Sequence, residues 1–132
     1  MAWILAALGR TREAREHLAE VPRAHPWSFG LMVGGEACVM LQDAAMGREV
    51  YAALGPAAER MFFAGAPGMV FGPTARTLGN LALLLGQRAD ALRHYDAALA
   101  SCQKLQFPIL IEQCRRARDA AALGCAPTDG QR

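Results

Sequence analysis

The sequence predicts an all-α fold in which about seven helices stack as successive hairpins of a solenoid. The main observation is a sequence segment that occurs twice. Residues 8–18 return in one register as residues 85–95, with glycine, acid, alanine, histidine and a bulky apolar residue at matching positions. Apolar residues recur at helical spacing between Gly and Pro breakers, and no segment has a convincing strand pattern. With 53% apolar but only 7% aromatic residues, the interior must be built largely from small aliphatic side chains, which permit close helix packing.

Breakers and periodicity place the first two helices. Residues 3–8 are expected to form the first helix, which ends at Gly9. Thr11 is expected to cap the second helix, over residues 11–21, and Pro22 closes this helical pair.

The next three helices are read from the same signals. The third is expected over residues 27–41, and Asp43 begins a fourth that stops at residues 55–56, a Gly-Pro pair. The fifth starts near residues 73–74, where proline suits a first turn, and it ends at Gly86.

The last two helices are expected over residues 88–105 and 108–123. The former carries the strongest amphipathic stripe of the chain, and Pro108 opens the latter. A single helical-repeat domain then covers residues 1–124, and we expect a disordered tail over residues 125–132.

The turns of the hairpins set the repeat register. They fall at Gly9, Gln42, Gly86 and Gly124, with spacings typical of helical-hairpin repeats. The seventh helix then has no second helix to complete its hairpin, and at the N-terminal end of the array the apolar residues 1–5 form no polar cap. Because a solenoid without polar caps exposes apolar surface at its ends, we expect self-association there or docking to a companion chain.

Small and aromatic residues stand at fixed positions in the clearest repeat, namely Leu78, Gly79, Gly86, Ala91, Tyr95 and Ala98. A looser set occurs one hairpin earlier, at Gly35, Gly47, Tyr51 and Leu54. This pattern resembles the tetratricopeptide repeat. The resemblance implies a right-handed α-α superhelix, in which the small residues let helix backbones approach and Tyr51 or Tyr95 fills the resulting groove.

Two further segments, residues 50–57 and 71–79, carry a more particular resemblance. They are similar to the C-terminal helical-repeat arm of bacterial signal-transduction ATPases, a group that includes LuxR-type transcriptional regulators and ATPase-linked adenylate or guanylate cyclases. The resemblance implies an arm that senses ligands or partners for a separate module. The chain departs from the whole-protein pattern, since it contains no G-x-x-x-x-G-K-[ST] phosphate loop, no cyclase module and no recognisable DNA-binding domain.

Four polar residues are candidates for partner binding. Arg76 and Asn80 lie one turn apart on the fifth helix, and Arg115 and Arg118 lie on the seventh. Both are first helices of hairpins, which line the concave surface in tetratricopeptide arrays. Guanidinium and amide donors in such a groove can hold a carboxylate from a peptide terminus or an acidic small molecule. The alternative is a basic face that is merely solvated.

The insert over residues 60–72 is unusually apolar and contains Phe62, Phe63, Met69 and Phe71. Burying each large apolar side chain is favourable by about 1.5–3 kcal/mol, so something must cover them. Either the insert folds back over the neighbouring hairpins, or it forms an adhesive patch for another chain or the mouth of an apolar ligand pocket.

Charge and motif spacing exclude several function classes. A net charge of +2 does not indicate a nucleic-acid partner, and no apolar run is long enough to span a membrane. No basic residue precedes the first apolar run, which favours a packed helix over a signal peptide. Without an export signal, the protein is expected to be cytoplasmic.

The cysteines and histidines have no metal-ligand spacing, and nothing indicates a cofactor. Reduced thiols are expected, although Cys102 and Cys114, on successive helices, leave a disulfide open. His17 and His94 are interpreted as solvated surface residues.

These observations favour a non-catalytic module that binds a protein or peptide, as a fragment of a signalling ATPase or transcriptional regulator. The alternative function is sensing of a small-molecule effector beside the apolar insert. An enzyme lacks support, because no nucleophile has a positioned base and no carboxylate pair stands out.

Overall fold

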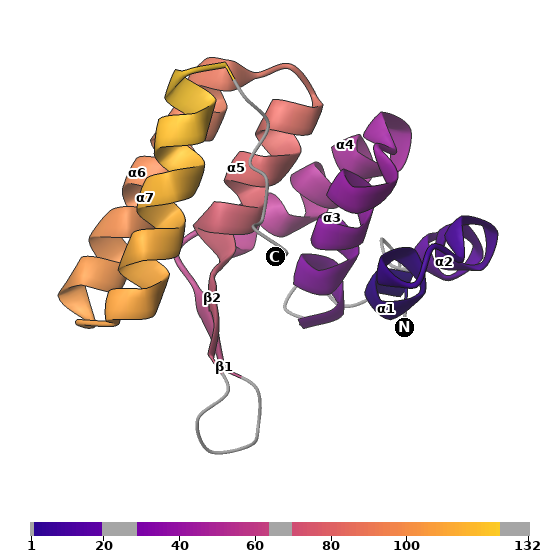
Figure 1. Cartoon of the computed structure of the whole chain (residues 1–132), viewed down its shortest axis with the longest axis horizontal. Coiled ribbons are helices and arrows are strands. Elements are labelled where there is room, and N and C mark those ends of the chain that lie inside the picture. The colour runs from indigo at the N-terminus through magenta and orange to yellow at the C-terminus, as the bar shows by residue number, and fades with distance from the viewer. Residues whose placement is uncertain (1, 20–28, 64–69, 125–132) are drawn as a thin grey trace.

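The computed structural model describes residues 2–19, 29–63 and 70–124 of the chain (Figure 1). These residues are mostly helical, and the all-α prediction is confirmed. Among the described helices, none is long and apolar enough to cross a membrane. In chain order the described α-helices are α1 (Ala2–Ala7), α2 (Thr11–Leu18), α3 (Phe29–Leu41), α4 (Ala44–Leu54), α5 (Thr74–Leu84), α6 (Arg88–Lys104) and α7 (Pro108–Ala122), and a 3₁₀-helix, η2 (Gly55–Ala57), extends α4. The sequence-predicted helix residues 20, 21, 27 and 28 and the predicted tail over 125–132 lie outside the described residues.

Left-handed backbone conformations occur at all four turn positions that the repeat register predicts. The φ angles are 74° at Gly9, 53° at Gln42, 75° at Gly86 and 79° at Gly124. Glycine adopts this conformation without a steric penalty, which explains three of the four residues. At Gln42 the side-chain amide donates a hydrogen bond to the Val39 carbonyl at 2.7 Å, which stabilises the non-glycine turn.

Two helix starts show how local chemistry sets the boundaries. Asp43 stands at the start of α4 as expected, and it caps the helix, because its Oδ1 accepts a hydrogen bond from the Met46 amide at 3.1 Å. The prediction that Thr11 caps α2 is wrong. Arg10 occupies the cap position without a side-chain cap bond, and Thr11 is already the first helical residue. The Arg10 guanidinium instead pairs with Glu13 in the first turn, at 2.6 Å.

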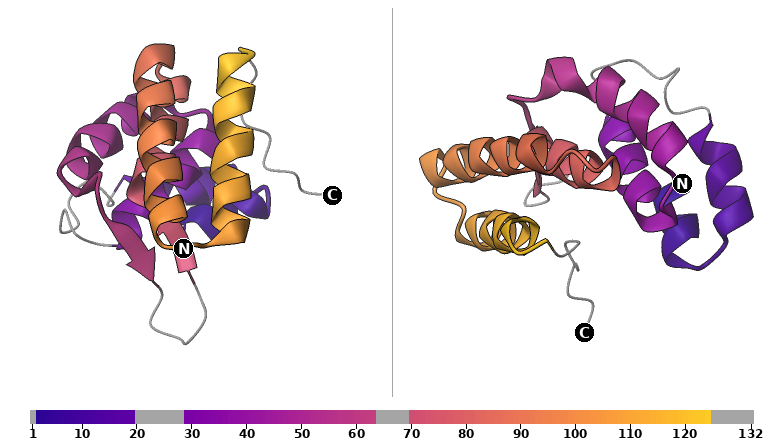
Figure 2. Two further views of the ribbon diagram at one scale, coloured as in Figure 1. Left: turned by 90° about the vertical axis from the view of Figure 1, so that its left-hand side faces the viewer. Right: turned by 90° about the horizontal axis from the view of Figure 1, so that it is seen from above.

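The helices pack as hairpins that lie against one another. α1 packs on α2, α3 on α4 and α5 on α6, while α3 also contacts both α1 and α5. α7 packs against α6, and it lies in front of α6 in Figure 1 and beside it when viewed from above (Figure 2). The first helices of the three hairpins are therefore consecutive neighbours.

Glycine permits the closest helix approaches. A Cβ atom added to Gly79 would lie 2.6 Å from the Tyr95 ring, so Tyr95 fills the groove at this position as expected. The equivalent expectation for Tyr51 is wrong. A Cβ atom at Gly35 would meet Thr77, Leu81 and Val50 instead, while Tyr51 reaches across to α6.

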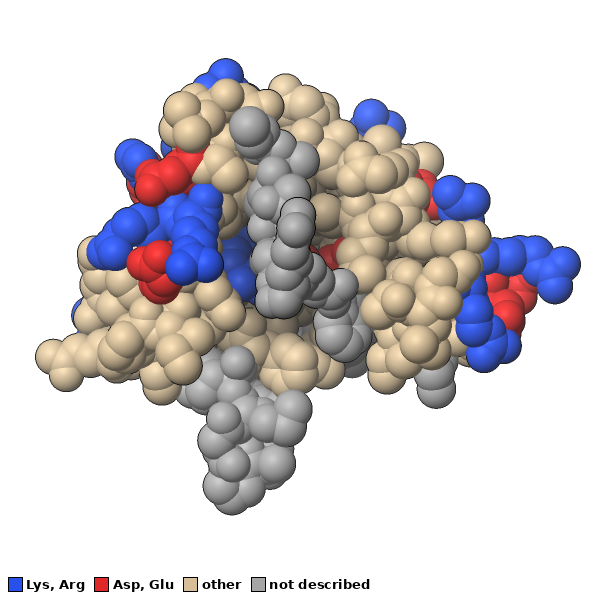
Figure 3. Space-filling view, in the orientation of Figure 1, with Lys and Arg blue, Asp and Glu red and all other residues tan. Residues whose placement is uncertain are grey.

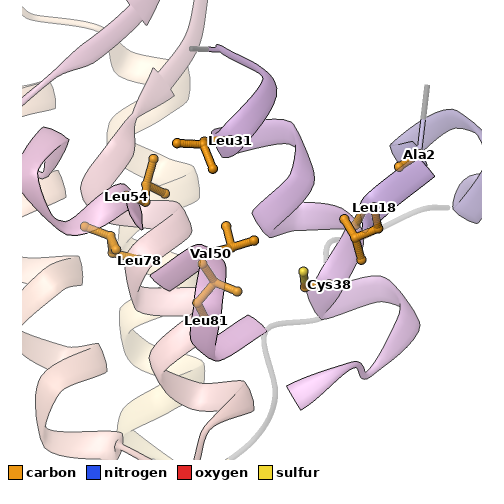
Figure 4. Close-up of a cluster of buried hydrophobic side chains, with 9 residues drawn as sticks. Ala2, Leu18, Leu31, Cys38, Val50, Leu54, Leu78 and Leu81 are labelled. Carbon is orange, nitrogen blue, oxygen red and sulfur yellow. The ribbon is translucent and has the colours of Figure 1, made fainter. Parts of the chain in front are cut away.

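The main core joins the first three hairpins. Leu31, Val50, Leu54, Leu78 and Leu81 are fully buried where α3, α4 and α5 meet (Figure 4). Burial of each such side chain stabilises the fold by about 1.5–3 kcal/mol. A second cluster attaches α7 to α5 and α6, and consists of Ala75, Ala98, Cys102, Leu110 and Cys114.

A two-stranded sheet was not expected from the sequence. β1 (Met61–Phe63) and β2 (Val70–Pro73) pair antiparallel, with Met61 opposite Pro73 and Phe62 opposite Gly72. Phenylalanine and valine favour such a ribbon, but both strands are too short to show an alternating pattern. The ribbon leads directly into α5 (Figure 1), and the fold stays predominantly helical.

Candidate functional site

A polar network lies between α3 and α5, among otherwise apolar packing. Glu36 is the only charged residue of α3, and it faces Thr77 and Asn80 on α5. The Thr77 hydroxyl donates a hydrogen bond to Glu36 Oε1 at 2.7 Å. The Asn80 amide nitrogen lies 3.2 Å from Oε1 and 3.1 Å from Oε2. Thr77 and Asn80 are only 3% and 7% exposed, whereas Glu36 is half-buried.

Tyr95 extends this network to α6. Its hydroxyl donates a hydrogen bond to Asn80 Oδ1 at 2.6 Å. Because the carbonyl end of the Asn80 amide is held by Tyr95, the NH₂ end is directed toward Glu36. A continuous chain of hydrogen bonds therefore runs from α6 through α5 to the carboxylate on α3, and fixes its orientation.

Glu36 has no basic partner among the described residues. Within the part of the chain that the structure describes, no lysine, arginine or histidine nitrogen lies at ion-pair distance from this carboxylate. The other half-buried acidic residues of that part each pair with an arginine, in the pairs Glu13–Arg10, Asp43–Arg15 and Asp90–Arg93. Glu36 is thus the half-buried acid that has only neutral hydrogen-bond donors.

The predicted pair Arg76 and Asn80 does not present its donors together. Arg76 Nη1 donates to Gln113 Oε1 on α7 at 2.9 Å, so its guanidinium faces the α5–α7 interface. The Asn80 amide faces Glu36 at the α3–α5 interface instead. An external carboxylate would have to displace Glu36 to reach that amide. The partner-binding roles of both residues stay predictions.

The other two predicted arginines form ion pairs on the surface of α7. Arg115 lies 3.4 Å from Glu112, and Arg118 pairs with Asp96 of α6. The hydrogen bond to Asp96 raises the pKa of Arg118 above its ordinary value. Basic and acidic side chains accordingly alternate over this part of the surface (Figure 3). The arrangement agrees with the alternative of a solvated face, in which each base has an acid beside it.

The structure describes the apolar insert in part. The Phe71 ring of β2 packs edge-to-face against Phe29 at the start of α3, with ring centroids 4.4 Å apart. Phe62 is half-buried in β1. Phe63 belongs to β1 by its backbone, and Met69 lies outside the described residues. Phe71 therefore covers a neighbouring hairpin, as one of the two interpretations predicts.

His94 is not the solvated residue that the sequence suggested. Its Nε2 lies 2.9 Å from the Tyr51 hydroxyl, which joins α6 to α4. Burial lowers the pKa of His94 below its ordinary value of 6.5, so the folded state favours the neutral ring. His17, by contrast, is exposed on α2 as expected.

The cysteines that the structure describes are buried free thiols. Cys102 and Cys114 approach to 3.9 Å between their sulfurs, which is well beyond a disulfide bond. Burial raises the pKa of Cys114 to about 12 and also raises that of Cys102. Such thiols are poor nucleophiles at neutral pH. No group of three or more metal-ligating side chains occurs in the described segments.

Sequence reasoning missed Glu36 and Thr77, the two residues that complete the polar network. The available signal was a lone acid inside the apolar helix of residues 29–41. Comparison of the chain with protein-family models, with curated proteins and with solved structures finds no match.

Proposed function

We propose that this chain is a non-catalytic helical-repeat module that binds a protein or peptide across α3, α5 and α7. The observation that carries the proposal is the contact of α3 with both α1 and α5, combined with left-handed turns at the predicted register. Successive first helices side by side are characteristic of a right-handed tetratricopeptide-like superhelix, in which they line the concave surface. We take α3, α5 and α7 as that surface.

Polar side chains on these helices supply the recognition chemistry. Glu36 lies at the α3–α5 interface, while Arg76 and Gln113 meet at the α5–α7 interface. Acceptors and donors thus follow one another across the surface, as recognition of an extended segment requires. A catalytic role has less support, because burial keeps the described thiols protonated and His94 is engaged by Tyr51.

The wider biological setting depends on the sequence resemblance. We propose that the module serves a cytoplasmic signalling ATPase or transcriptional regulator, in which it reports a bound partner to an effector module. Sensing of a small-molecule effector is the second candidate. The half-buried Phe71 and the partly exposed Phe29 favour it, because their edge-to-face pair offers an apolar contact surface.

Self-association through the two ends of the array belongs to the same proposal. Ile4 of α1 is 51% exposed, and Leu8, directly after α1, is 67% exposed. At the other end of the array, Ile109 of α7 is 75% exposed and Leu123 is 81% exposed, while Glu112 pairs with Arg115 and Arg116 on the same helix. Light scattering over a concentration series tests this part, and a strict monomer would remove it.

Site-specific photocrosslinking tests the binding surface. A photoreactive amino acid replaces Gln113 on α7 in one variant and Glu49 on α4 in a matched control, because both residues are exposed. We expect a cellular partner to crosslink at position 113 and not at position 49. Equal capture at both positions, or stabilisation of the chain by a metabolite without any protein partner, would contradict the proposal.

A further inference from the structure

We propose that Glu36 is the anchor for a lysine or arginine side chain of the bound protein segment. This inference rests on the proposed function and specifies the chemistry of the partner. It follows from the arrangement of the carboxylate, from the lack of a basic partner among the described residues and from its place in the surface.

The carboxylate of Glu36 is held in a fixed orientation. Its donors, Thr77 and Asn80, are both buried, and the buried Tyr95 hydroxyl fixes the Asn80 amide in turn. Apolar side chains of similar volume would pack two helices at least as favourably as such a network. A carboxylate that is oriented by three side chains is therefore suited to recognition, where preorganisation reduces the entropy lost on binding.

Charge complementarity identifies the group that Glu36 accepts. The described segments supply it with neutral donors but no cation, although each other half-buried acid there has an arginine. A carboxylate offers about four lone-pair sites, so the donors from Thr77 and Asn80 do not exhaust it. The partial exposure of Glu36 leaves it accessible. An ammonium or guanidinium group supplies both the missing charge and further hydrogen bonds, whereas an anion would be repelled.

The position of Glu36 favours a protein segment over a free amine. Arg76 and Gln113 continue the polar surface from α5 to α7, where Arg115 and Glu112 add further charges. An extended chain that places a basic side chain at Glu36 can also contact these groups, whereas a small amine would contact Glu36 alone. We therefore expect basic peptides to bind and free lysine amide to show no measurable binding.

Selection of random peptides displayed on phage against the full chain tests this inference. We expect the selected peptides to be enriched in lysine or arginine. The Kd of one such peptide should increase about tenfold or more with Glu36→Gln, because a charge-assisted hydrogen bond is lost. Glu49→Gln is the matched control, since it removes the same charge from an exposed position on α4 and should leave the Kd unchanged.

Acetylation of the basic residue in the peptide provides a second measurement that leaves the protein intact. It should weaken binding to the wild-type chain as much as Glu36→Gln does, and it should add little when the two changes are combined. Peptides without basic enrichment, or equal binding of the acetylated peptide, would overturn the assignment of Glu36. If such peptides still compete with crosslinking at position 113, the proposed binding surface survives. If no peptide binds, both proposals fail.

Discussion

Replacement of Gly79 by alanine tests the tight packing of α5 against α6. The added Cβ atom would lie 2.6 Å from the nearest atom of the Tyr95 ring, and Tyr95 is fully buried. Relief of such an overlap costs about 1–3 kcal/mol in a well-packed core. A shift of the ring also weakens the 2.6 Å hydrogen bond from Tyr95 to Asn80, which is worth about 0.5–1.5 kcal/mol.

The helix itself opposes this loss, because alanine is favoured over glycine in a helix interior by about 1 kcal/mol. We therefore expect Gly79→Ala to lower the free energy of unfolding by about 0.5–3.5 kcal/mol. Urea unfolding followed by circular dichroism measures this difference. The matched control is Gly55→Ala, where no atom lies within 4 Å of the new Cβ and φ is −47°.

The control should leave stability unchanged or raise it by up to about 1 kcal/mol. Two chemically identical substitutions are therefore expected to differ, with a loss of stability at Gly79 only. Gly79→Ala that is as stable as the wild type would refute it, because Tyr95 would then have room to move and could not hold the Asn80 amide in place.

Three further predictions follow from the contacts between helices. The pKa of His94 in the folded chain lies below its ordinary value of 6.5, so near and below pH 6.5 the unfolded chain binds more protons than the folded chain. The free energy of unfolding should therefore fall as the pH decreases below about 6.5. Urea titrations over a range of pH should show a weaker dependence of the free energy of unfolding on pH in His94→Gln, and an unchanged dependence would count against the burial of the His94 ring. Gly86→Ala should destabilise by about 1–2 kcal/mol, because its φ of 75° is strained for any residue with a Cβ; thermal melting would disprove this by showing an unchanged midpoint. Cys114 should react with a thiol reagent only as the chain unfolds, since burial raises its pKa to about 12, and rapid labelling of the native chain would contradict its burial.

Local signals account for the parts of the fold that the sequence could predict. A left-handed turn needs a residue that tolerates positive φ, so Gly9, Gly86 and Gly124 mark helix ends without reference to tertiary structure. The spacing of the repeats then identified Gln42 as a turn position, which could not be recognised from the residue type because Gln42 is not a glycine. Pro108 likewise stands at the start of α7 because proline suits a first turn.

Contacts between distant residues account for what the sequence could not predict. The hydrogen bond between Asn80 and Glu36 joins residues 44 positions apart in the sequence. The one between Tyr51 and His94 joins residues 43 positions apart. Helical periodicity places Asn80 on a particular helix, but it does not reveal that the Asn80 amide already donates hydrogen bonds to a carboxylate from another hairpin.

The short ribbon before α5 was missed for a related reason. Its strands gain their order by pairing with each other and by the bond from the Thr74 amide to the Arg60 carbonyl, at 2.9 Å. Segments of three or four residues carry too little periodicity to predict such pairing.

Nuclear magnetic resonance tests whether a protein segment binds across α3, α5 and α7. The isotope-labelled full chain is titrated with a selected basic peptide, and the shifted signals are mapped onto the fold. We expect shifts concentrated at Glu36, Asn80 and Gln113, with none at Glu49 on α4. Shifts confined to α4 and the outer side of α6, or no shifts at peptide concentrations well above the Kd, would contradict it.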